Sequence, residues 1–195
     1  MKAKLAIKTV AAVALAASMP VAVAHDEHQE DLNPDSFAGV VRDVRQAANR
    51  FQDVNTATAE GYVSTASCVS GPNEGAMGVH YVNSTLVEDG VLDVRRPEVL
   101  VYEPHEGGLR LVAVEFFVVA QQWDAANTEA PIIGGQHLNY VGAPNRLRLP
   151  AYYELHVWAW KRNSDGVFSD WNAAVSCAGY VGETSAVTTA PAHGH

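Results

Sequence analysis

The chain has 195 residues and carries 22 acidic against 13 basic side chains, which gives a formal net charge of −9. An acidic surface repels the phosphates of nucleic acids and anionic lipid headgroups, so the charge argues against both as partners. The same field attracts metal ions and other cationic ligands.

The first 24 residues have the three parts of a cleavable secretory signal peptide. Three lysines precede an uncharged run from Thr9 to Val23, and Ala22-Val23-Ala24 places small residues where signal peptidase reads them. The run is interrupted by Pro20 and is short for a bilayer span, which favours cleavage over a retained membrane anchor. Cleavage removes three of the 13 basic side chains, so the remaining 171 residues would carry a charge near −12 in the bacterial periplasm or outside the cell.

After cleavage the chain suits a single domain with its own core. We expect a flexible acidic lead-in over residues 25–33, one globular domain over 34–182 and a disordered tail over 183–195. Cys68 and Cys177 are expected to form a disulfide that closes this domain, as an even pair does in an oxidising compartment. Two thiolates holding a metal are the alternative, which is less favoured because neither has a second cysteine nearby.

The clearest helical pattern runs from about Asp35 to Glu60. It begins at capping residues after Pro34, repeats apolar residues at i, i+3, i+4 and i+7, and ends at Gly61. We therefore expect one long N-terminal helix whose apolar stripe packs on a sheet.

The remaining segments have the β-branched and aromatic composition of strands. The clearest strands cover 79–82, 99–102, 109–120 and 152–160. Residues 121–150 form a Gly- and Pro-containing stretch with little periodicity, a length typical of a lid or binding loop over one face. The predicted class is α+β, with the long helix packed on an antiparallel sheet.

Alternation along two of these strands gathers charged and aromatic side chains. In the predicted strand 109–120, both faces of the stretch 111–119 are apolar except for Glu115, and a buried lone carboxylate needs a partner, a proton or a metal ion. The facing strand offers partners. One face of 152–160 presents Tyr152, Glu154, His156, Trp158 and Trp160.

Two further histidines could join this group. His80 stands at the start of strand 79–82 after a Gly-rich turn, and His137 lies in the long loop. With His156 and Glu115 they would form a mixed nitrogen and oxygen site for Zn, Cu or Fe. The residues expected to wall this pocket are Trp158, Phe117, Tyr152 and Glu154.

Simpler interpretations stay open for each histidine. No pair among His80, His137 and His156 has the short fixed spacing of H-x-x-x-H or H-x-H, so nothing in the sequence forces them together. A core imidazole bonded to a nearby carboxylate would explain His156, and a structural hydrogen bond in the turn would explain His80. His137 could be an exposed loop residue, and Arg146 and Arg148 are expected to be solvated loop charges.

A second metal hypothesis concerns the chain ends. Cleavage after Ala24 would expose His25, whose free amine and Nδ1 can chelate Cu(II). The simpler interpretation is that the histidines at the chain ends are solvated and bind metal only loosely. Met77 is the one methionine that would remain, which argues against a Cu(I) carrier because thioether clusters select that ion.

Four motifs stand out as a set: GAMGVHYVN at 75–83, LVYEP at 100–104, LHVWAW at 155–160 and WNAAVSC at 171–177. Together they resemble a family of small exported bacterial proteins that is uncharacterised. The resemblance implies no activity, but it places His80 and His156 in the shared pattern.

These observations predict an exported α+β domain with a His/Glu/aromatic pocket that binds a divalent metal ion; enzymatic activity and oligomeric state stay open. The first alternative is a metal-free module that stacks a small organic ligand on Trp158, Trp160 and Tyr152. The second is an envelope interaction protein with purely structural histidines. No G-x-S-x-G, H-E-x-x-H or P-loop motif occurs in the sequence.

Overall fold

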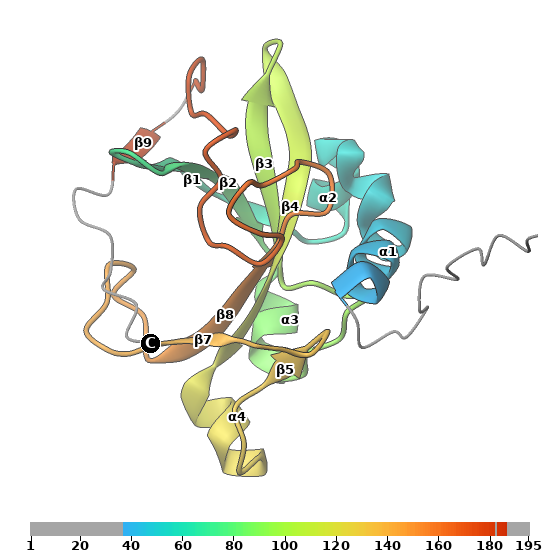
Figure 1. Ribbon diagram of the computed structural model, residues 1–195, viewed down its shortest axis with the longest axis vertical. Helices are drawn as coiled ribbons and strands as arrows, with labels where there is room; N and C mark the ends of the chain where they lie inside the picture. Colours follow the sequence, from blue (N-terminus) through green and yellow to red (C-terminus); the bar gives the residue numbers. More distant parts are fainter. Residues whose placement is uncertain (1–36, 182, 187–195) are drawn as a thin grey trace, which may run out of the picture. The chain divides into compact units, whose positions relative to one another are not determined.

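The structure is a computed structural model that describes residues 37–181 and 183–186 (Figure 1). The predicted signal peptide, the acidic lead-in with His25, and the last nine residues of the tail lie outside these ranges. Within them, no helix combines the length and apolar character needed to cross a membrane.

A seven-stranded sheet forms the centre of the fold, with the strand order β7-β8-β4-β3-β2-β1-β9. Neighbouring strands are antiparallel except for β1 and β9, which are parallel. The strands of this sheet are β1 (Val63–Gly71), β2 (Gly75–Val82), β3 (Val99–His105), β4 (Gly108–Val119), β7 (Asn139–Val141), β8 (Tyr152–Val157) and β9 (Glu183–Ala186). A separate two-stranded hairpin consists of β5 (Ile132–Ile133) and β6 (Gln136–His137).

The prediction of one long helix from Asp35 to Glu60 is wrong. The described part of this range forms three short segments, α1 (Phe37–Ala48), the 3-10 helix η1 (Asn49–Gln52) and α2 (Val54–Ala59). The break lies at Asp53, whose backbone is extended and whose carboxylate accepts a hydrogen bond from the Asn55 amide at 3.0 Å. Asp53 therefore caps a new helix instead of continuing the old one.

The fold is accordingly sheet-rich with short helices, which corrects the expected α+β arrangement of a long helix on a sheet. Two further short helices are α3 (Ser84–Asp89) and α4 (Ala120–Ala126). The expected long loop over 121–150 is also partly ordered, because it contains most of α4, the β5–β6 hairpin and the edge strand β7.

The apolar stripe of α1 and η1 packs on one face of the sheet. Its contacts form the main core, whose fully buried members include Val40, Val44, Phe51, Leu100, Tyr102, Val114, Phe116, Leu155 and Val157. The Tyr102 hydroxyl also donates a hydrogen bond to the backbone oxygen of Phe51 at 2.8 Å. One face of the sheet is thus committed to the helices, and the other face is left for the polar residues of β2, β4 and β8.

The predicted strand 152–160 ends earlier, at Val157. Beyond it the Trp158 amide donates to the Val167 oxygen, and the Trp160 amide donates to the Val112 oxygen. This turn carries the Trp160 side chain to the helix side, where its Nε1 donates to Asn49 Oδ1 at 3.3 Å. Strict alternation therefore misplaced Trp160, which does not share a face with His156.

The predicted disulfide between Cys68 and Cys177 is present and closes a sequence separation of 109 residues. It ties the C-terminal segment to β1, and β9 then pairs with β1 in parallel. Glu183–Ala186 therefore forms a strand although 183–195 was expected to be a disordered tail. The covalent link keeps this segment beside the open edge of β1, where its backbone groups find partners.

Candidate metal centre

The pairing of four strands places His80, Glu115 and His156 on one face of the sheet. His80 on β2 lies opposite Val101 on β3, and Val101 lies opposite Ala113 on β4. Glu115, two residues further along β4, lies opposite His156 on β8. Because side chains two apart share a face, all three point away from α1.

The three side chains converge. One ligand atom of each lies within 4.8 Å of the other two. Glu115 Oε2 is 3.6 Å from His80 Nε2 and 4.0 Å from His156 Nε2. Two ligands on a tetrahedral Zn²⁺ with bonds of about 2.0–2.1 Å stand roughly 3.4 Å apart. The group could therefore hold a metal ion after small side-chain shifts.

His156 is buried without hydrogen bonds for its ring nitrogens. The residue is 1% exposed, and neither Nδ1 nor Nε2 has a hydrogen-bond partner in the described part of the chain. The Nε2 atom faces Glu115, and Nδ1 lies 3.8 Å from Asp170 Oδ1, which is beyond hydrogen-bond range. Buried polar atoms in this state are rare and costly, and an ion bound to Nε2 would relieve the cost.

The charge states of the three groups are coupled. Burial raises the pKa of Glu115 to about 8. Burial lowers the pKa of His156, but the carboxylates of Glu115 and Asp170 outweigh it and raise that pKa to about 9. For His80, burial and the charges of His156 and Arg146 lower the pKa to about 3, which leaves a neutral imidazole. The Glu115–His156 pair thus shares a proton that a bound cation would replace.

A carboxylate stands behind His156. Asp170 is 7% exposed, and its Oδ1 accepts a hydrogen bond from Asn139 Nδ2 at 3.2 Å. Asn139 belongs to the edge strand β7, which pairs with β8. A carboxylate facing Nδ1 of a histidine, with Nε2 facing the ion, is the usual support of a metal-binding imidazole.

Sequence analysis did not find Asp170 or Asn139. Asp170 lies in an irregular segment after β8, and Asn139 lies in the stretch interpreted as a loop. Neither position has a periodic pattern that predicts which way its side chain points, so no sequence signal could have found them.

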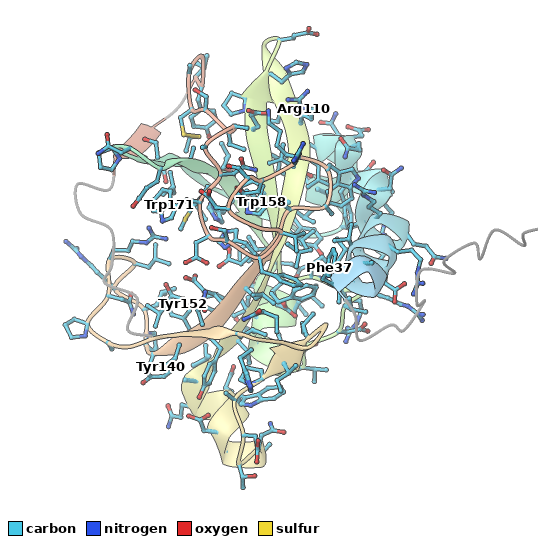
Figure 2. The ribbon with its side chains drawn as sticks, viewed as in Figure 1. Phe37, Arg110, Tyr140, Tyr152, Trp158 and Trp171 are labelled. Carbon is cyan, nitrogen blue, oxygen red and sulfur yellow. A yellow bond between two sulfur atoms is a disulfide. The ribbon has the colours of Figure 1, made fainter. Side chains whose placement is uncertain are left out.

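Aromatic rings lie on the same face of the sheet as the three ligands. Trp158 is almost parallel to the His156 ring at a centroid distance of 6.1 Å, and its Nε1 donates to the Ser169 oxygen. Phe117 stacks on Tyr152 at 4.6 Å. Figure 2 shows Trp158 and Tyr152 on the side of the sheet away from Phe37 of α1.

Glu154, the fourth expected wall residue, is 5% exposed and lies on β8 opposite Phe117. The nearby Glu154 carboxyl helps to raise the pKa of Glu115. Glu154 therefore adds negative charge beside the three candidate ligands, which favours a cation there.

His137, the fourth candidate ligand, is not brought to the site. It is exposed on β6, where it pairs with Ile132 of the β5–β6 hairpin. The group of three candidate ligands does not include it. The interpretation of His137 as an exposed residue is the one that the structure supports.

Comparison of the chain with models of protein families, with curated proteins and with solved structures gave no match. The resemblance to an uncharacterised exported family stays a prediction. The function is therefore inferred from the residues and geometry of this chain alone. Its disulfide indicates an oxidising, extracellular compartment.

Proposed function

We propose that the protein is exported and binds one divalent metal ion through His80, His156 and Glu115. The observation that carries this proposal is the convergence of their ligand atoms within 4.8 Å around the buried His156, whose ring nitrogens lack hydrogen bonds within the described part of the chain. Two imidazoles and one carboxylate form the ligand set of His₂Glu zinc sites and of 2-His-1-carboxylate iron sites. Imidazole also suits copper, so Zn, Cu and Fe are the ions to compare.

Export is supported by two features that are independent of the metal site. The first 24 residues have the composition of a secretory signal, and the Cys68–Cys177 disulfide belongs to an oxidising compartment. A cleaved, exported chain would meet metal ions outside the cytoplasm.

The geometry favours the metal over the two alternatives. An organic ligand would need an exposed aromatic surface, but Trp158 and Tyr152 are 4% and 1% exposed and Trp160 packs on the helix side. Purely structural histidines would be expected to make hydrogen bonds, yet His156 makes none from its ring nitrogens within the described ranges.

Three protein ligands leave at least one coordination position for water or a substrate. Such a position is what metal-assisted hydrolysis or oxygen chemistry requires. The His80 side chain is 13% exposed, compared with 7% for Glu115 and 1% for His156. Access to the ion would therefore come from the His80 side.

Metal content of the untagged protein that begins at His25 tests the proposal. After reconstitution with Zn, Cu or Fe and removal of free metal, inductively coupled plasma mass spectrometry should find about one ion per chain. The His80→Ala/His156→Ala double variant should lose that ion. The matched control is His137→Ala, which removes an exposed imidazole outside the group and should keep it.

Two outcomes would reject the proposal. One is a metal content below about 0.2 equivalents for every ion tested, which is too little for a specific structural or catalytic site. The other is full metal content in the double variant with an unchanged circular dichroism spectrum, because the ion would then be bound elsewhere.

A further inference from the structure

Arg146 brings a positive charge to the His80 side of the candidate metal centre. Its Nη2 lies 3.2 Å from the sulfur of Met77, three residues before His80 on β2. Its guanidinium carbon lies 5.8 Å from the centre of the Trp171 ring. Trp171 directly follows Asp170, whose Oδ1 lies 3.8 Å from His156 Nδ1. Arg146 is exposed, as the interpretation of a solvated loop charge predicts, and its guanidinium also belongs to the surroundings of the site.

No carboxylate neutralises this guanidinium within the ranges that the structure describes. Its neighbours are a thioether and an indole ring, neither of which carries charge. The negative groups near the site, Glu154 and Asp170, act instead on Glu115 and His156. The site is therefore polarised, with carboxylates around His156 and a cation near His80.

Trp171 offers a second donor without an acceptor. Its Nε1 is buried and has no hydrogen-bond partner among the described residues. The other three indoles of the chain donate at 2.5–3.3 Å, to the Glu129 and Ser169 backbone oxygens and to the Asn49 side chain. A buried N–H group normally finds an acceptor, so the exception at Trp171 points to a ligand.

Trp171 is held close to β2 by the backbone. The next residue, Asn172, forms a bridge with Ala76, and their amide and carbonyl groups exchange hydrogen bonds of 3.2 Å. Met77, the contact of Arg146, follows Ala76 directly. The Arg146 guanidinium and the Trp171 N–H, which have no anionic or carbonyl acceptor among the residues the structure describes, thus both lie beside the strand that carries His80.

We propose that the metal-loaded site binds a small oxyanion, a carboxylate or a phosphate, through the open coordination position, Arg146 and the Trp171 N–H. One oxygen of the anion would coordinate the metal, and another would accept hydrogen bonds from the Arg146 guanidinium. The paired N–H donors of a guanidinium fit both carboxylates and phosphates. The inference rests on the proposed metal binding, because the ion supplies one of the anchors.

The test uses protein loaded with Co²⁺, whose visible absorption reports changes in coordination, titrated separately with acetate and with inorganic phosphate. At least one anion should change the spectrum of the unmodified protein with saturation. Arg146→Met should weaken that binding at least about 10-fold, as expected for a lost charge-assisted hydrogen bond. Arg146→Lys, which keeps the charge but loses the fork, should fall between the two.

Arg148→Met is the matched control, because it removes an exposed positive charge two residues away and should leave anion binding unchanged. Trp171→Phe, which keeps a ring and removes the N–H, should weaken anion binding several-fold. The preferred anion identifies the source of the ligand, since acetate stands for carboxylates and phosphate for phosphorylated compounds.

The proposal is overturned if the Co²⁺-loaded protein responds to neither anion, or if Arg146→Met binds the anion as well as the unmodified protein does. Metal content is measured before any anion is added, so a failure of metal binding is seen separately. Arg146→Met should retain its metal, because removal of a nearby cation cannot weaken attraction for another cation.

Discussion

Replacing Glu98 with Gln should make the stability of the fold much less dependent on pH. Glu98 is 1% exposed, and its Oε2 accepts a hydrogen bond from the Phe117 amide at 3.0 Å. Its other oxygen, Oε1, has no hydrogen-bond partner in the part of the chain that the structure describes. Burial raises the pKa of this carboxyl to about 8, although the Phe117 amide acts in the opposite direction.

The sign and size of the effect follow from this pKa. In the unfolded chain the carboxyl has an ordinary pKa near 4.5, so between these two values the folded state binds more protons. The contribution of the protonated Glu98 carboxyl to the free energy of unfolding is fully present below about pH 4.5 and is lost as the pH rises through about 8. At 1.36 kcal/mol per pKa unit, the full loss has an upper value of about 5 kcal/mol.

The assay is urea unfolding at a series of pH values from 5 to 9, with the free energy of unfolding compared between the unmodified protein and Glu98→Gln. Gln cannot ionise and keeps an oxygen for the Phe117 amide, so the variant should gain several kcal/mol relative to the unmodified protein between pH 5 and pH 9. Glu88→Gln is the matched control, because Glu88 is exposed.

A difference between Glu98→Gln and the unmodified protein that stays constant within about 1 kcal/mol from pH 5 to pH 9 would refute this reasoning. Such a result would mean that Glu98 ionises in the folded protein as easily as in the unfolded chain. A pH-dependent difference of the same size between Glu88→Gln and the unmodified protein would refute it too, because Glu88→Gln keeps Glu98 and should follow the unmodified protein at every pH.

Three further changes should have defined effects. Replacing Cys68 and Cys177 together with Ser opens a loop of 109 residues and should lower the free energy of unfolding by about 4–5 kcal/mol; an unchanged urea midpoint would contradict this. Gly78→Ala should lower the melting temperature far more than Gly166→Ala does. Both glycines have φ near +114°, but a Cβ at Gly78 would lie 2.5 Å from a backbone oxygen of β3, whereas a Cβ at Gly166 would meet open space. Equal losses of melting temperature would show that the backbone conformation alone matters. Asp170→Asn should weaken metal binding about 10- to 100-fold, measured by isothermal titration calorimetry, while circular dichroism shows that the chain stays folded. An unchanged metal affinity would show that Asp170 does not support His156 as a ligand.

The convergence of Glu115 and His156 could be anticipated because strand alternation fixes which side chains share a face. Glu115 is an acid in the otherwise apolar stretch 111–119, and His156 lies among alternating polar and aromatic residues. Their direct pairing across β4 and β8 follows from the register. His80 joins them through β3, which the sequence predicted as a strand but could not place between β2 and β4.

The features that sequence analysis missed depend on local competition or on irregular segments. The helix ends early because the Asp53 side chain caps a new start, which hydrophobic periodicity does not register. Trp160 changes face because β8 ends at Val157. Asp170 reaches His156 from a segment without regular periodicity, so only the tertiary structure brings it there.

Anomalous X-ray diffraction from crystals of the zinc-loaded protein tests the central claim most directly. The account predicts one strong peak about 2.0–2.2 Å from a nitrogen of His80, a nitrogen of His156 and an oxygen of Glu115. A peak at His137 or at the histidines near the chain ends, with none between these three side chains, would contradict it.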